Sequence, residues 1–132
     1  MLPIFFAYVL TIPVLMAFDL SWLGFVAKGF YQSRLGFLPL GVIWPAAAAF
    51  YIIFTAGLFY FVSLPGWRAH SLSHTILLGA LFGFFTYATY DLTNMATLIG
   101  WPLSITIIDI AWGTLLGGIL GAASYGWLLL LA

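Results

Sequence analysis

Three aspartates are the only acidic side chains of the chain, and each lies in a long apolar stretch: Asp19, Asp91 and Asp109. A carboxylate inside a bilayer costs at least ~2.5–3.5 kcal/mol, so such residues usually face the interior of a helix bundle. With no basic residue in the same stretches, their partners must be hydroxyls, indoles, amides, water or a bound cation. The three aspartates therefore predict a polar site inside a membrane protein.

The spacing of the aspartates places them at one depth. Asp91 lies nine residues before Gly100, and Asp109 lies nine residues after it. If two helices meet in a turn at Gly100, each carboxyl lies ~13 Å along its helix, at ~1.5 Å per residue. Asp19 lies nine residues before Lys28, where the first apolar stretch ends on the same side. We therefore expect the three carboxyls to converge just beneath one headgroup layer.

An indole follows two of these aspartates by three residues, Trp22 after Asp19 and Trp112 after Asp109. Residues three apart on a helix are neighbours, so each indole lies about one turn from a carboxyl. The third aspartate is flanked by a tyrosine and an asparagine. The predicted ligand-binding set is Asp19, Trp22, Tyr90, Asp91, Asn94, Asp109 and Trp112. The alternative is that each aspartate is a hydrogen-bonded staple that fixes helix register and binds no ligand.

The composition indicates the elements that must position this set. Hydrophobic residues make up 65% of the 132 residues, charged residues make up 5%, and the mean hydropathy is +1.20. A span of a ~30 Å hydrocarbon core needs about 20 apolar residues. Four stretches meet this requirement, at residues 3–27, 40–64, 72–99 and 102–131. The sequence predicts an all-α fold, a single domain over residues 1–132 formed by four transmembrane helices with short loops, the second closed by Pro65-Gly66.

Small residues recur every fourth position in the last two stretches, as in Gly79 and Gly83, and in Gly113, Gly117 and Gly121. Such spacing lets helix backbones approach closely in lipid. Both series continue in register to an aspartate. They therefore predict close packing of two helices that also carry the site.

Two further segments have polar character. Residues 28–39 mix aromatic with basic and polar side chains, which indicates an interfacial helix or loop along the headgroups. His70 and His74 are four residues apart, a spacing that suits a metal, but no third ligand accompanies them. No metal site is predicted, and no cofactor is indicated.

Several classes are excluded. The net charge is zero, so no nucleic-acid partner is expected. Cysteine is absent, which removes disulfides and thiolate chemistry. No phosphate-binding loop or serine–histidine–acid arrangement is present. Lysine and arginine are too few to orient the protein in the membrane.

Several segments resemble a known family, the small bacterial membrane proteins grouped as domain of unknown function 2177. They are Asp19-Leu-Ser-Trp22-Leu-Gly24, Phe30-Tyr31-Gln-Ser-Arg34-Leu-Gly36, Gly79-Ala-Leu-Phe-Gly83, Thr89-Tyr90-Asp91-Leu92-Thr93-Asn94, Ala96-Thr97-Leu98, Trp101-Pro102 and Asp109-Ile-Ala-Trp112-Gly113. The resemblance implies a multi-pass protein of the bacterial inner membrane with four spans. It carries no activity over to this chain.

Three functions remain open. The first is a protein that binds or permeates protons, a cation or a small polar molecule, with transport requiring a homo-oligomer. The second is an intramembrane enzyme that acts on a lipid or fatty acyl chain, with an aspartate as general acid or base. The third is a non-catalytic assembly partner of other membrane proteins. An acid-lined pocket open sideways to lipid would favour the second, and one open to water would favour the first.

Overall fold

Four helical stretches are long and apolar enough to cross a membrane: Leu2–Phe25, Trp44–Arg68, Leu72–Thr97 and Leu103–Leu131. The computed structural model describes residues 1–36 and 41–132, and within these ranges it contains helices and no strand. The predicted all-α membrane bundle of four transmembrane helices is confirmed.

The first two spans each contain a turn of π-helix. Helix α1 (Leu2–Ser21) continues directly into η1 (Trp22–Val26). The second span consists of α3 (Trp44–Leu58), η2 (Phe59–Ser63) and α4 (Leu64–Arg68). A π-helix bonds each N–H to the carbonyl five residues back, and such turns are frequent at functional sites.

The second span differs from its predicted range of 40–64. The helix begins at Trp44, and residue 40 lies outside the described residues. At the other end the helix continues through Pro65 and Gly66 to Arg68. Proline removes an N–H donor from a helix interior, and Pro65 lies at the second residue of α4, directly after the π-helical turn η2. Proline here marks a change of helix type and not an end.

The remaining spans, predicted at 3–27, 72–99 and 102–131, correspond to α1–η1, α5 (Leu72–Thr97) and α6 (Leu103–Leu131). A short connection joins α5 to α6. Its Gly100 has φ +90°, a left-handed conformation that glycine adopts without steric cost.

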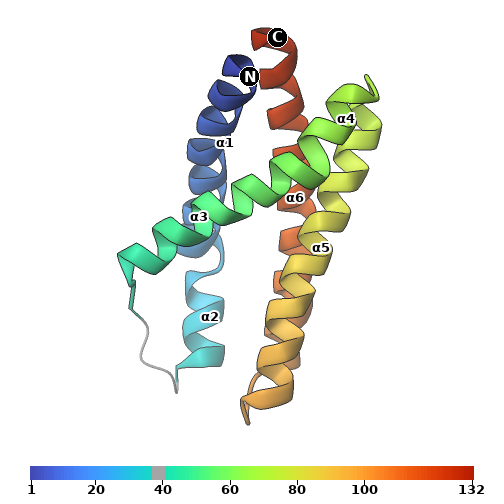
Figure 1. Ribbon diagram of the computed structural model, residues 1–132. Helices are drawn as coiled ribbons and strands as arrows, with labels where there is room; N and C mark the ends of the chain where they lie inside the picture. The colour runs from blue at the N-terminus through green and yellow to red at the C-terminus, as the bar shows by residue number, and fades with distance from the viewer. Residues whose placement is uncertain (37–40) are drawn as a thin grey trace.

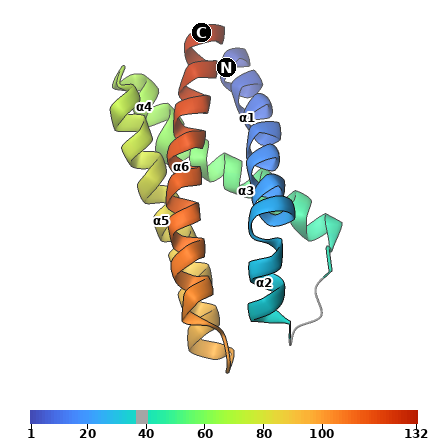
Figure 2. The same ribbon diagram turned by 180° about the vertical axis from the view of Figure 1, so that it is seen from behind.

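The helices form a bundle in which one span crosses the others obliquely. Figures 1 and 2 show α1, α5 and α6 running roughly along one axis, with both termini at the same end. The second span crosses this group at a steep angle, from the end of the first span towards the top of α5. Because it covers only part of α5 and α6, it leaves their other part uncovered on that face.

Helix α2 (Lys28–Leu35) follows η1 in the mixed segment predicted to be interfacial. It continues in nearly the direction of α1 and does not turn across the bundle (Figures 1 and 2). Arg34 donates a hydrogen bond from Nη1 to Ser104 Oγ at 2.9 Å, which ties α2 to the start of α6. Residues 37–39 of that prediction lie outside the described residues.

The predicted close approach of the two glycine-bearing helices is present between α5 and α6. A Cβ atom added at Gly79 would collide with the backbone of Gly117, and one at Gly83 would collide with the backbone of Gly113. A Cβ at Gly121 would lie 2.8 Å from the carbonyl oxygen of Thr75. Only glycine permits this separation of the two backbones.

The apolar core lies where α1, α3, η2 and α6 meet. Its largest fully buried side chains include Leu15, Leu58, Leu116 and Leu120. This packed half of the bundle supports the half that contains the aspartates.

Candidate ligand-binding site

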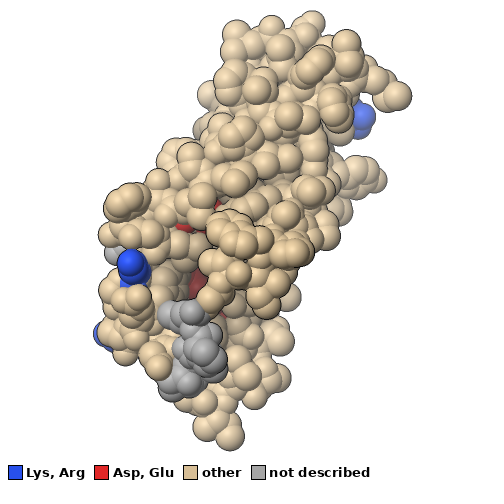
Figure 3. Space-filling view, turned by 90° about the vertical axis from the view of Figure 1, so that its left-hand side faces the viewer, with Lys and Arg blue, Asp and Glu red and all other residues tan. Residues whose placement is uncertain are grey.

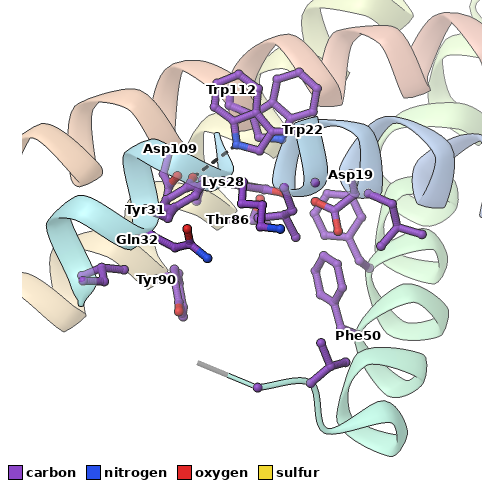
Figure 4. A pocket seen from close by; sticks show the side chains of 18 of the residues that line it. Asp19, Trp22, Lys28, Tyr31, Gln32, Phe50, Thr86, Tyr90, Asp109 and Trp112 are labelled. Carbon is purple, nitrogen blue, oxygen red and sulfur yellow. Dashed lines mark hydrogen bonds between the residues drawn. The ribbon is translucent and has the colours of Figure 1, made fainter. Parts of the chain in front are cut away.

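A cavity of about 950 Å³ opens between α1, η1, α2, the middle of α3, and the parts of α5 and α6 near their connection. Most of its wall is apolar and aromatic, as Figure 4 shows for the residues drawn. The polar groups in the wall come from Asp19, Trp22, Lys28, Tyr31, Gln32, Thr86, Tyr87, Tyr90, Trp101, Asp109 and Trp112. Figure 3 looks at the bundle from the side and shows carboxylate atoms deep in the hollow.

Asp19 is held by a neighbouring helix. Its side chain is 9% exposed, and Tyr51 of α3 donates a hydrogen bond from its hydroxyl to Asp19 Oδ2 at 2.9 Å. The bond joins residues 32 positions apart in the chain. A buried carboxylate is stable only with such donors, so Tyr51 both satisfies Asp19 and fixes the middle of α3 against α1.

Asp109 lies in the same cavity wall with less support. It is 8% exposed, and its Oδ1 atom is buried without a hydrogen-bond partner. An unsatisfied buried acceptor costs about 1–3 kcal/mol, and more when charged. Asp109 is therefore the group in this wall with the greatest need for a donor or a cation.

The two predicted indoles lie face to face. The rings of Trp22 and Trp112 are stacked with centroids 4.4 Å apart and an interplanar angle of 5°. Trp22 Nε1 donates to the Tyr31 hydroxyl at 3.2 Å, drawn as a dashed line in Figure 4. Trp112 Nε1 is buried without a partner. Trp22 begins η1, so the π-helical turn positions its ring against α6.

Tyr90 also lines the cavity, at its rim. Its side chain is 61% exposed and packs edge-to-face with Trp101, with centroids 6.3 Å apart. Five of the seven predicted residues thus share the cavity wall: Asp19, Trp22, Tyr90, Asp109 and Trp112.

Asp91 and Asn94 do not line this cavity. Asp91 is 0% exposed, and both of its carboxyl oxygens are buried without a hydrogen-bond partner. Tyr87, one turn earlier on α5, lines the cavity and covers Gly113 of α6. The structure therefore brings two aspartates to one cavity and encloses the third outside its wall.

Several residues that line the cavity, or that hold one of its side chains as Tyr51 holds Asp19, were not predicted from the sequence. Tyr51 is one of few polar side chains in α3, which is a signal that a search for hydrogen-bond donors would have found. Lys28, Tyr31 and Gln32 lie in the segment predicted to be interfacial, and α2 places them in the wall instead. Thr86 carries no local pattern that distinguishes it from other threonines of α5.

The described residues contain no group of three or more histidine, cysteine, aspartate or glutamate side chains that could hold a metal ion. His70 and His74 are exposed near the start of α5, and His70 has φ 51° in the turn before it. Neither histidine lines the cavity.

Comparison with known proteins gives one match. A family model described as "Predicted membrane protein (DUF2177)" matches residues 4–126. No curated protein and no solved structure matches the chain. The match includes all or most of each of the four helical stretches that could cross a membrane. The chain therefore belongs to the DUF2177 family of predicted membrane proteins.

Proposed function

We propose that this protein binds an amphipathic small molecule taken from the bilayer, and that Asp109 and Asp19 recognise a cationic or hydrogen-bond-donating group at one end of that molecule. The observation that carries the proposal is that Asp109 lines a large and mainly apolar cavity while its carboxyl oxygen Oδ1 has no hydrogen-bond partner. We further propose the inner membrane of a bacterium as its location, as the family resemblance implies.

The size of the cavity favours a molecule over a proton or a bare cation. Ligand pockets measure roughly 300–1,000 Å³ and are mainly apolar with a few polar groups that orient the ligand. The cavity of about 950 Å³ lies in that range. A single cation would leave most of its apolar wall without a partner.

The charges of the wall favour a cationic or donating group. The wall contains two carboxyl groups, those of Asp19 and Asp109, and one ammonium group, that of Lys28. Tyr51 already supplies a donor to Asp19, and Asp109 Oδ1 has none. The stacked indoles of Trp22 and Trp112 add aromatic surface, which attracts cations where a ring face is reached.

The position of the cavity favours entry from lipid. Figure 3 views the bundle perpendicular to the long axis of α5 and α6, and the hollow is visible from that side. The cavity lies among the four helical stretches that are long and apolar enough to cross a membrane. A molecule that enters from this side comes from the lipid phase, so most of that molecule must be apolar.

The unpaired oxygen of Asp109 also supports a second candidate, an intramembrane enzyme that acts on a lipid. A carboxyl group without a partner at a cavity wall is placed to accept or donate a proton as general base or acid. Binding is the simpler function, and such an enzyme would bind its substrate by the same contacts.

The other predicted functions receive less support. The glycines that would dock a partner's helix are already packed between α5 and α6. Permeation would require a path beyond this cavity, which a homo-oligomer would have to complete.

The test is binding of dodecylamine to purified protein in detergent, measured by native mass spectrometry and by the ligand-induced rise in Tm. We expect Asp109→Asn to weaken binding at least tenfold. Asp91→Asn is the matched control, because it makes the same change outside the cavity wall. Its Kd for dodecylamine should stay within about threefold of the wild-type value. A tenfold change in Kd corresponds to ~1.4 kcal/mol. Lauric acid, which reverses the head charge, should bind more weakly than dodecylamine.

Equal binding of dodecylamine to the wild type and Asp109→Asn would overturn the proposal. A preference for lauric acid would overturn the assigned head chemistry.

A further inference from the structure

A second hollow, of about 580 Å³, lies between η2 and α5. Its walls are Phe61 and Val62 on η2, and Leu78, Phe82 and Phe85 on α5. The second span crosses α5 obliquely (Figure 1). The ring of Phe82 forms its floor, with the ring of Phe61 at 6.4 Å and that of Phe54 at 5.2 Å between centroids.

Thr86 connects this groove to the cavity, because it lines both. Phe54 and Phe82 stand at the same junction: Phe54 lines the cavity, Phe82 lines the groove, and their rings are in contact. The two hollows therefore adjoin each other at Thr86, with the contacting rings of Phe54 and Phe82 between them.

The groove offers no free polar group. Its two threonines donate their hydroxyls to carbonyls of their own helix, Thr86 to Phe82 at 2.8 Å and Thr89 to Phe85 at 2.6 Å. The other lining side chains are apolar. An alkyl chain can lie along such a surface without leaving any donor unsatisfied.

The length and shape of the groove suit one chain. Thr86 and Leu78 are separated by ~12 Å along α5, at ~1.5 Å per residue. An extended alkyl chain has carbon–carbon bonds of ~1.5 Å in a zigzag, so a chain of about a dozen carbons would reach from Asp109 along this groove. A docked helix would need small residues for close approach, whereas the groove carries phenyl rings.

We propose that the ligand of the cavity is a long single-chain amphiphile: its head lies at Asp109, and its alkyl chain passes Thr86 and lies in the groove between η2 and α5. This inference rests on the proposed function and adds the tail site. The apolar groove provides no hydrophobic gain over lipid, because lipid tails are equally apolar. The position of the chain, and not its affinity, is therefore the property to measure.

The experiment uses two photoreactive amines, dodecylamine and hexylamine, each with a diazirine on the terminal carbon. The full chain is reconstituted in lipid nanodiscs and irradiated, and the adducts are located by peptide mass spectrometry. We expect the dodecyl probe to label the groove, at Phe61, Leu78 or Phe85, and the hexyl probe to label the cavity, at Phe50 or Phe54. Excess unlabelled dodecylamine should remove both signals, and Asp109→Asn should reduce both at least fivefold.

Leu78→Trp fills the groove and leaves every residue of the cavity wall unchanged, so it provides the matched test. It should remove dodecyl labelling from the groove while the hexyl probe still labels the cavity, which shows that the variant is folded.

The outcomes are distinguishable. Groove labelling that is not competed and does not depend on Asp109 would show surface lipid only, and would overturn the inference. Labelling by the dodecyl probe confined to the cavity, still dependent on Asp109, would overturn the tail site and leave the proposed function standing. Loss of all dependence on Asp109 would overturn both.

Discussion

The indole ring of Trp22 stacks on that of Trp112, with a centroid distance of 4.4 Å and an interplanar angle of 5°. The pair joins η1 to α6, two elements about ninety positions apart in the chain, beside the carboxyl groups that their own helices carry. The stack fixes the relative position of Asp19 and Asp109, since each indole lies one helical turn from one of them.

The stack should contribute measurable coupling to stability. Trp22→Phe loses the hydrogen bond to Tyr31, whereas Trp112→Phe removes an N–H that has no partner. We therefore expect Trp22→Phe to lower Tm more. A double-mutant cycle with Trp22→Leu and Trp112→Leu, which remove both aromatic rings, should give a coupling of ~0.5–1.5 kcal/mol by thermal unfolding in detergent. Additive effects of the two substitutions would contradict a stabilising stack.

Tyr51→Phe should destabilise the protein by about 1–3 kcal/mol, because it leaves the buried Asp19 carboxyl without its donor. Tyr8→Phe is the control: Tyr8 donates to the Ile52 carbonyl at an exposed site, so its loss should cost only about 0.5–1.5 kcal/mol. Adding Asp19→Asn to Tyr51→Phe should recover part of the loss. The measurement is the free energy of unfolding in detergent, and equal costs for both tyrosines would argue against a special role for Tyr51.

Gly83→Ala should destabilise the bundle by roughly 1–3 kcal/mol, the usual cost of overpacking, because the added methyl would collide with the Gly113 backbone. Gly126→Ala on α6 meets nothing within 4 Å. It should be neutral or stabilising by up to about 1 kcal/mol, since alanine is the better helix former. The measurement is the Tm of each variant in the same detergent. An unchanged Tm for Gly83→Ala would be inconsistent with the close contact between α5 and α6.

Asp91→Leu should preserve or raise the Tm. Asp91 is fully buried with both oxygens unpaired, and replacing such a group with an apolar side chain of similar length removes the desolvation cost. Asp91→Asn keeps unpaired polar atoms and should be less stable than Asp91→Leu. A large loss of stability in Asp91→Leu would instead support the staple hypothesis, in which this carboxyl fixes helix register through partners such as ordered water.

Much of the architecture was predictable from the sequence because lipid imposes strict requirements. Apolar length predicted four helices that could span a membrane, and four-residue glycine spacing predicted the contact of α5 with α6. Proline and glycine at 65 and 66 were a misleading stop signal, since η2 lets the helix continue past them. A change from α- to π-helix depends on how the helix packs against its neighbours, and the local sequence pattern does not reveal that packing.

The candidate site was predictable in part. The cost of burying charge pointed to Asp19 and Asp109, and helical spacing pointed to Trp22 and Trp112. Tyr51 could be found as a donor by its residue type, but its pairing with Asp19 was not predictable, because that pairing depends on the oblique crossing of the second span. The same crossing angle decides which carboxyls face a cavity, so Asp91 could not be separated from the other two by spacing alone.

By itself, the sequence determined that the chain must place its acids inside a membrane bundle, since six charged residues cannot cover a soluble globule of 132 residues. Only the tertiary structure decided that Asp19 and Asp109 share a cavity, that Asp91 is enclosed outside it, and that a groove leads away along α5. The physical reason is that helix formation and membrane insertion depend on local composition, whereas hollows arise from the angles at which whole helices pack.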